Sequence, residues 1–419
     1  MIARCSGCAF VVLAFSLLGS AVDAEELGFP KRSVELQKGP SEGSLGYIYS
    51  SRDSVLFRLE LGSRSGTSGD SRSFVAWNAE TGKLLARRPA PEGPLPHHWQ
   101  FSPDGRFLAV PMFSLTRIVQ LWEVGSKDPQ GVPRLRLITE LRPKEPRPKG
   151  QPDANSRWRP NVDVAWTPDS KTLIVRHNIH DGPVPAQILF WSFTDKASVW
   201  PDPQEDDRGA RAWKPWAKLE FETHVDFAVS PDNRTLAVTE YYSRTSNGHL
   251  FDLQSAQPLE KFPLERNRDP KSGSTVNYQI VFSPDSKTLA ISGFRYFALW
   301  DVAPPTPRVE MLDADFHEMW GNLHKMDFTS DSRWLLTLNR YRTDRKLGRA
   351  AVVQVRDAQT AEVRHEVTFP EQLGLLHSLT DLPEHRVLLR FESKKGHRQF
   401  LWHTDDLLRY AVENGKTPR

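Results

Sequence analysis

The fold of this chain is decided by one stretch, Phe101-Ser102-Pro103-Asp104-Gly105-Arg106-Phe107-Leu108-Ala109-Val110. Two apolar runs flank a turn built on Pro103 and Asp104. Proline presets φ at the second position of a tight turn, an aspartate side chain bonds to nearby backbone, and glycine accepts the remaining conformation. The stretch therefore predicts the tip of a β-hairpin.

The same phrase occurs in seven places along the chain. Besides residues 101–110, matching copies occupy residues 166–173, 229–236 and 282–289, a degenerate copy occupies residues 328–335, and weaker copies occupy residues 51–56 and 382–388. Self-similarity of this kind marks a repeat architecture, because a single unit cannot bury its own apolar faces. We therefore expect seven structural units in one array.

Each hairpin tip is followed by a β-rich run that ends in a second mark, usually an aromatic residue and a polar partner. These marks are Trp77-Asn78, Trp122-Glu123, Trp191-Ser192, Phe251-Asp252, Trp300-Asp301, Arg356-Asp357 and Trp402-His403. With both marks present seven times, the chain resembles the WD40-repeat β-propellers over nearly all of its length. It departs from them in keeping the full Trp-Asp pair only at Trp300-Asp301 and in lacking the Gly-His pair before each first strand.

The predicted fold is all-β, a single seven-bladed β-propeller of four-stranded antiparallel blades over residues 25–419. No long stretch shows the 3.6-residue periodicity of a helical domain, whereas 32 prolines and 25 glycines suit many turns. The seventh unit reaches its third strand at residues 399–402 and continues into a short helical tail, residues 404–419. We expect an N-terminal strand at residues 33–37 to supply the missing fourth strand, because a closed ring leaves no exposed sheet edge.

The first residues have the pattern of a signal peptide. Arg4 precedes an apolar run at residues 9–18, and Val22-Asp23-Ala24 follows as a cleavage site. We therefore predict a leader over residues 1–24 and an exported bacterial protein, periplasmic or secreted. The apolar run is too short to span a bilayer and no later segment approaches the needed length. Both cysteines, Cys5 and Cys8, fall in the leader.

Signals for catalysis or cofactor binding are poor. His177 and His180 lack a third metal ligand, and no G-x-S-x-G elbow, phosphate loop or zinc-protease motif occurs. The turn acids recur once per blade around the rim, so they do not converge on one substrate. With 55 basic and 52 acidic residues, the chain lacks the sustained basic stripe that nucleic acid demands. We expect no cofactor, no metal and no nucleic-acid partner.

The leading interpretation is an exported, non-enzymatic propeller that acts as a monomeric platform for a protein partner. Arg side chains pair with carboxylates and stack on aromatic rings, so clustered Arg and Tyr favour an acidic partner. The resemblance places such residues of three consecutive blades on one face: Tyr241, Tyr242, Arg244, Arg295, Tyr296, Tyr341, Arg342 and Arg345. The competing explanation is that the Tyr rings pack between blades and the Arg side chains are solvated.

The alternative function is an exported propeller enzyme or a small-ligand or metal-binding propeller, similar to a lactonase, with its site in the central channel. One fold can host either function. A channel site would require polar side chains from several blades to converge, which a sequence does not display.

Overall fold

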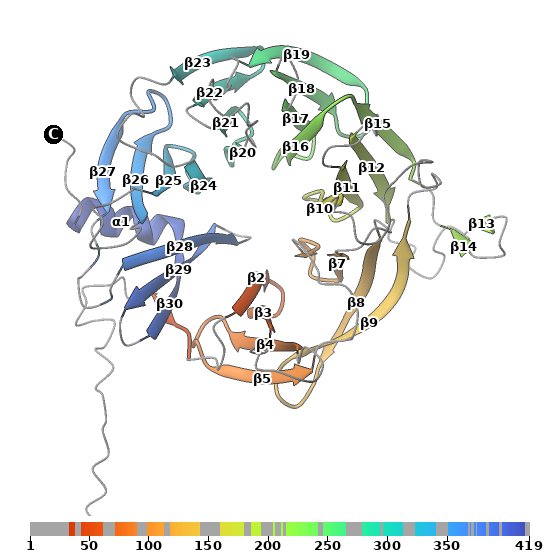
Figure 1. Cartoon of the computed structure of the whole chain (residues 1–419), viewed down its shortest axis with the longest axis vertical. Coiled ribbons are helices and arrows are strands. Elements are labelled where there is room, and N and C mark those ends of the chain that lie inside the picture. The colour runs from red at the N-terminus through yellow and green to blue at the C-terminus, as the bar shows by residue number, and fades with distance from the viewer. Residues whose placement is uncertain are drawn as a thin grey trace, which may run out of the picture.

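The protein is described by a computed structural model in which seven blades form a closed ring (Figure 1). The described residues are 33–37, 43–61, 72–89, 99–112, 118–142, 160–179, 186–193, 204–205, 211–212, 215–241, 246–264, 279–293, 296–312, 323–340, 351–367, 369, 373, 375–382, 385–393 and 396–414. Among them, no helix combines the length and apolarity needed to cross a bilayer.

Seven four-stranded antiparallel sheets make up the ring, as the sequence predicts. In each sheet the strands follow one another from the channel outward, so each hairpin phrase joins the first strand of a blade to the second. Blade 1 contains β2 (Gly43–Ser50), β3 (Val55–Leu61), β4 (Arg72–Asn78) and β5 (Leu84–Pro89), and blade 2 contains β6 (Gln100–Phe101), β7 (Phe107–Pro111), β8 (Val119–Lys127) and β9 (Pro133–Leu141). Blade 3 contains β10 (Pro160–Trp166), β11 (Thr172–Ile179), β12 (Ala186–Ser192) and β15 (Ala217–Phe221), and blade 4 contains β16 (His224–Val229), β17 (Thr235–Tyr241), β18 (Ser246–Asp252) and β19 (Pro258–Leu264).

The remaining blades complete the circle. Blade 5 contains β20 (Gln279–Phe282), β21 (Thr288–Gly293), β22 (Tyr296–Val302) and β23 (Pro305–Leu312), and blade 6 contains β24 (Leu323–Phe328), β25 (Trp334–Arg340), β26 (Ala351–Asp357) and β27 (Val363–Val367). Blade 7 contains β28 (Leu375–Leu382), β29 (Arg386–Ser393), β30 (Gly396–His403) and β1 (Val34–Glu35). A small hairpin of β13 (Gln204–Glu205) and β14 (Arg211–Ala212) lies between β12 and β15 in sequence and projects outside the ring (Figure 1).

The N-terminal segment closes the ring, which confirms the predicted closure. β1 pairs antiparallel with β30 as the outermost strand of blade 7. The next residues reach blade 1, where the indole N–H of Trp77 donates to the carbonyl of Gln37 at 3.0 Å. Leu36 is 6% exposed and packs in a buried cluster that joins blades 7 and 1. The two ends of the chain therefore hold the same seam together.

The helical tail is confirmed as α1 (Thr404–Asn414), which lies against blades 6 and 7. Its buried side chains Leu407, Tyr410 and Ala411 belong to the apolar cluster between these blades. Asp405 in its first turn accepts hydrogen bonds from the backbone N–H and the hydroxyl of Ser330, at 3.2 and 2.7 Å. The tail thus fastens the blade 6 hairpin tip to the end of blade 7.

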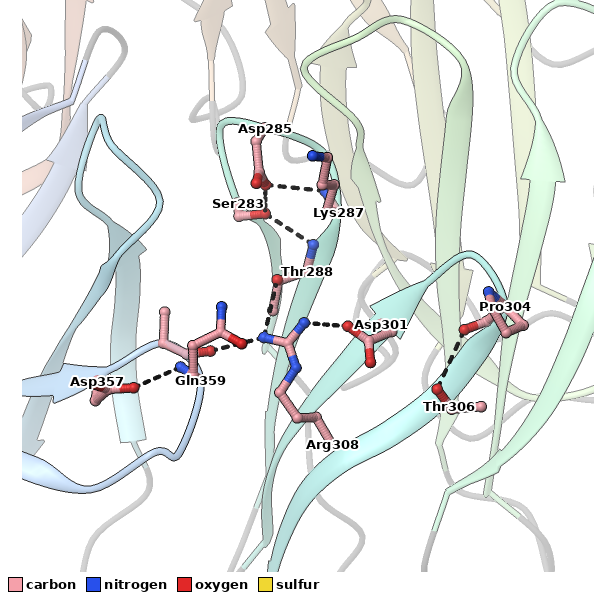
Figure 2. A network of polar contacts seen from close by, with 11 residues as sticks. Ser283, Asp285, Lys287, Thr288, Asp301, Pro304, Thr306, Arg308, Asp357 and Gln359 are labelled. Atoms are coloured by element: carbon pink, nitrogen blue, oxygen red, sulfur yellow. Dashed lines mark hydrogen bonds and ion pairs between the residues drawn. The ribbon is translucent and has the colours of Figure 1, made fainter.

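The repeated phrase folds as expected, with one pattern of hydrogen bonds at each clear copy. In blade 5, the Ser283 hydroxyl donates to Asp285 at 2.5 Å and accepts from the N–H of Thr288 at 2.9 Å, while Asp285 accepts from the N–H of Lys287 at 3.1 Å (Figure 2). Blades 2, 3, 4 and 6 repeat these contacts. The Ser/Thr and Asp side chains satisfy turn N–H groups that the ladder leaves unpaired.

The polar residue of the second mark also stabilises a turn. Asp357 accepts hydrogen bonds from the N–H groups of Gln359 and Thr360, at 2.8 and 3.0 Å. Asp301 instead binds Arg308, whose guanidinium also donates to the carbonyl of Ala358 in blade 6 at 3.1 Å (Figure 2). The Trp-Asp pair of blade 5 therefore takes part in a contact between blades.

The core lies between the blades, where apolar clusters join each sheet to its neighbours. Trp77 and Trp191 at second marks are among the largest fully buried side chains. The indole N–H groups of Trp122, Trp191 and Trp300 are buried and have no hydrogen-bond partner within the described part of the chain. These tryptophans therefore stabilise the blades through packed area, in keeping with the missing Gly-His pairs.

Candidate functional site in the central channel

A cavity of about 700 Å³ lies in the channel, at the end where the hairpin tips meet. Every blade contributes to its wall, mainly through the innermost strand or the residues directly after it. The tips supply Ser51, Ser102, Pro103, Pro168, Pro231 and His385; the strands supply Tyr49, Gln100, Phe101, Trp166, Asp226, Phe227, Val229, Gln279, Ile280, Val281, Met326 and Asp327. The ring thus brings together residues up to 336 positions apart in sequence.

The wall between blades 3 and 4 is organised by a buried guanidinium. Arg176 on β11 has a side chain that is 5% exposed, and it forms ion pairs with Asp163 and Asp226 of the two innermost strands. It donates to the Asp226 carboxylate at 2.7 Å and to the carbonyl of Val225 at 2.8 Å. Asp226 also accepts from the N–H of Phe227 at 2.9 Å. These contacts hold the carboxylate in place at the cavity wall.

Further polar groups approach the cavity from other blades. Gln100 comes from blade 2, Gln279 from blade 5 and Asp327 from blade 6. The carbonyl of Gln100 accepts a hydrogen bond from the indole of Trp166 at 3.3 Å, which ties blades 2 and 3 at the wall. Carboxylate and amide oxygens on several sides, with aromatic rings between them, are suited to a small ligand that carries several hydroxyl groups.

The turn acids Asp104, Asp169 and Asp232 directly follow three prolines of the cavity lining in sequence. Burial acts to raise the pKa of Asp169, but hydrogen bonds from Thr167 and from the N–H of Lys171 outweigh it, so that the pKa lies below its usual range. The hydroxyl of Thr167 donates to this carboxylate at 2.6 Å. Asp169 is thus engaged in its own turn, and the expectation that turn acids are structural agrees with this arrangement.

His385 is the titratable side chain at the mouth on the blade 7 side. It is half-buried, and its backbone has φ of +54°, in the left-handed region. Its carbonyl accepts a hydrogen bond from the N–H of Thr404 at 2.8 Å. An imidazole can accept or donate a proton near neutral pH, which makes it a candidate acid or base for a ligand in the cavity.

No group of three or more His, Cys, Asp or Glu side chains with the arrangement of a metal site occurs among the residues that the structure describes.

The Tyr and Arg residues predicted to contact a partner are largely outside the described residues. Tyr242, Arg244, Arg295, Tyr341, Arg342 and Arg345 all fall there. Tyr241 is the last residue of β17, paired in register with His224. Tyr296 is 0% exposed and packs in the cluster between blades 4 and 5, with its hydroxyl donating to Glu310 at 3.3 Å. For Tyr296 the prediction of a surface contact is wrong, because the ring fills the core.

Sequence reasoning missed the channel residues, although two weak signals were present. Asp163, Asp226 and Gln279 each stand three residues before the residue that opens a turn phrase. His385 stands where the other turns carry Gly, Ser or Asn. Neither signal showed convergence, since the residues come together only when the ring closes.

No protein-family model matches the sequence, and no curated protein matches it either. Solved structures do resemble it. A protein from Lactobacillus plantarum is 15% identical with a TM-score of 0.51, covering 80% of this chain and 88% of that one. The periplasmic gluconolactonase of Pseudomonas aeruginosa is 14% identical with a TM-score of 0.52, covering 79% and 86%. The Dos1 propeller is 12% identical with a TM-score of 0.50, covering 85% and 77%. At these identities the likeness shows the propeller fold.

These comparisons correct the leading functional interpretation. One of the solved propellers of this fold is a gluconolactonase, so the fold is compatible with an enzymatic site, which the leading interpretation had set aside. The prediction of a non-enzymatic scaffold is therefore wrong, and the alternative with a site in the central channel is the better supported. The repeat pattern misled because it reports blade architecture, which enzymes and scaffolds share.

Proposed function

We propose that this protein is a propeller enzyme that hydrolyses a small polyhydroxylated ester, of the sugar-lactone type, in its central channel. The observation that carries the proposal is the convergence of His385, Asp226 and Asp327 from three different blades on one cavity of about 700 Å³. That volume falls in the range of about 300–1,000 Å³ typical of small-molecule sites. The neighbouring gluconolactonase supports the substrate class.

The wall chemistry fits such a substrate. A sugar lactone presents hydroxyl groups around its ring, and these bind carboxylate and amide groups such as Asp226, Gln279 and Gln100. Its carbon face packs on aromatic rings, which Trp166 and Phe227 provide. Arg176 holds Asp226 in a fixed position, so that the substrate does not have to order this group on binding.

Lactone hydrolysis needs a water molecule made nucleophilic next to the ring carbonyl and a proton for the departing ring oxygen. Asp327 of blade 6 and His385 of blade 7 bring ionisable residues to the cavity lining from a second part of the ring. They are the groups that we assign to substrate binding and proton transfer.

The test is a pH-stat assay of D-glucono-1,5-lactone hydrolysis, corrected for the spontaneous reaction. We expect saturable turnover, and a loss of at least about tenfold in kcat/KM for Asp327→Asn, the scale of one lost hydrogen bond to a charged group. Glu123→Gln is the matched control, because it removes one carboxylate that is paired with Arg136 away from the cavity lining. A rate equal to the spontaneous one, with no gluconate binding by calorimetry, would remove the lactone assignment.

Two finer assignments belong to the same proposal. The Trp at five second marks supports a divergent relationship to WD40 propellers, and close homologues that lacked this Trp would contradict it. The leader pattern around Arg4 and Ala24 supports activity outside the cytoplasm, where a soluble sugar derivative would be the substrate.

A further inference from the structure

All seven hairpin tips place one residue in the left-handed region, and one of them is unlike the others. The φ values lie between +51° and +68°. Six of the positions hold small residues: Ser54, Gly105, Ser170, Asn233, Ser286 and Ser332. Small or short polar residues suit this conformation, because a larger side chain is strained there. The seventh position holds His385.

The small residues have a structural role. The hydroxyl oxygens of Ser170, Ser286 and Ser332 each accept the backbone N–H of the turn Asp in the preceding blade, at 2.9, 3.0 and 3.0 Å. Asn233 forms the corresponding link between blades 3 and 4 by bonding the carboxylate of Asp169. At four of the seven tips, the side chain in the left-handed position therefore bonds its blade to the blade before it.

Between blades 6 and 7, a residue outside the blade 7 tip forms the corresponding hydrogen bonds. Asp405 of α1 bonds the blade 6 tip through both the N–H and the hydroxyl of Ser330. The imidazole of His385 forms no hydrogen bond or ion pair in the part of the chain that the structure describes. His385 is one of the residues that line the channel cavity, together with Tyr49 and Ser51 of the adjoining blade 1. The tail helix thus leaves position 385 without a bonding role between blades.

We infer that His385 is the proton-transfer residue of the channel site, the general base that activates water for attack on the lactone carbonyl. This inference rests on the proposed function. Turn geometry does not account for an imidazole here, since Ser or Asn meets the same backbone requirement elsewhere in the ring. Among the seven left-handed tip residues, His385 is the one that lines the cavity, and an imidazole can accept and return a proton in general acid–base catalysis.

The step balances without a further reactant. The imidazole accepts one proton from water as the water oxygen bonds to the lactone carbonyl carbon. The tetrahedral intermediate collapses with cleavage of the ring carbon–oxygen bond, and the imidazolium returns its proton to the leaving ring oxygen. The product is the open hydroxy acid, and His385 ends in its starting state.

The decisive variant is His385→Asn, because Asn233 shows that Asn is accepted at this turn position. General-base catalysis contributes about 10²–10⁴-fold, so we expect kcat for D-glucono-1,5-lactone to fall at least about 100-fold while KM changes little. The pH-rate profile should also lose its limb near the pKa of an imidazole. Asn233→Ser is the matched control, with the equivalent exchange in a blade 4 turn residue outside the cavity lining, and it should retain activity.

The outcomes separate the inference from the proposed function. An active wild type with an equally active His385→Asn variant and an unchanged pH profile would overturn the inference alone. If the wild type hydrolyses no lactone, the proposed reaction fails. NMR of the His385 imidazole during a gluconate titration then tests whether His385 binds a ligand in the cavity. A saturable shift, absent in the Asn variant's spectrum, would keep His385 as a ligand-binding residue. No shift would reject both.

Discussion

Replacing Gly82 by alanine should open the ring at the seam between blades 7 and 1. Gly82 has φ of +67°, and a Cβ atom there would lie 2.0 Å from the carbonyl oxygen of Glu35 and 3.0 Å from Val34 Cγ1. Real atoms do not approach so closely, so the closure strand β1 has to move. Gly131 is the matched control: it has φ of +82° at the equivalent turn of blade 2, and a Cβ atom would meet nothing within 4 Å.

Both substitutions destabilise the protein through the left-handed backbone conformation, but only Gly82→Ala also disrupts contacts of β1. A left-handed alanine costs about 1–2 kcal/mol at either position. At Gly82 the displaced strand also loses the hydrogen bond from the N–H of Gln37 to the Gly82 carbonyl, 2.9 Å long, and loosens Leu36, which is 6% exposed. A hydrogen bond contributes about 1 kcal/mol and a buried leucine about 1.5–3 kcal/mol. Gly82→Ala should therefore destabilise by about 2.5–4 kcal/mol more than Gly131→Ala.

Urea unfolding followed by tryptophan fluorescence measures both free energies. In a Leu36→Ala background the difference between the two glycine variants should shrink, because part of the packing is already lost and neighbouring contacts are not additive. Equal destabilisation by Gly82→Ala and Gly131→Ala would refute the reasoning, since it would mean that β1 contributes nothing to stability at this seam.

Two further predictions concern pH and processing. Hydrogen bonds from the side chain and backbone of Ser255 lower the pKa of Asp252; burial acts to raise the pKa of Asp357, but hydrogen bonds from the N–H groups of Gln359 and Thr360 outweigh it, so this pKa is lowered too. Both carboxylates therefore stabilise the folded protein above about pH 4, and this stabilisation is lost as the pH falls through their pKa values in the folded state. The urea concentration at the unfolding midpoint should decrease as the pH is lowered below 4. An Asp252→Asn, Asp357→Asn double variant should show a smaller decrease, and an equal dependence of the midpoint on pH in both proteins would contradict the assignment. The leader pattern predicts that the protein purified from its native host begins at Glu25, and an intact mass that includes Met1 would contradict export.

The blade architecture was accessible from the sequence because its determinants are local. Ser283, Asp285 and Thr288 form their turn through contacts within six residues, so the same letters predict the same turn in each copy. The strand at residues 33–37 could be assigned to blade 7 by counting, since six units are complete and the last lacks one strand. Closure of the ring needs no information beyond that count.

The channel site was not accessible, because its members are distant in sequence and unremarkable one by one. Asp226 and Asp327 are 101 residues apart and occupy different positions in their strands, and His385 lies in the least regular copy of the phrase. The burial of Tyr296 was missed for a related reason. Its ring points into the space between blades 4 and 5, and the sequence does not show which side of a strand faces a neighbour.

The repeat, the number of blades, the turn chemistry and the use of both chain ends to close the ring can all be predicted from the order of the amino acids. Those features follow from hydrogen bonds and apolar periods within one unit or from counting units. The residues that meet across the axis, the ion pairs of Arg176 with Asp163 and Asp226, and the bond from Asp405 to the blade 6 tip become visible only in the folded ring. Such contacts depend on the angle between blades, which arises from the packing of the whole ring.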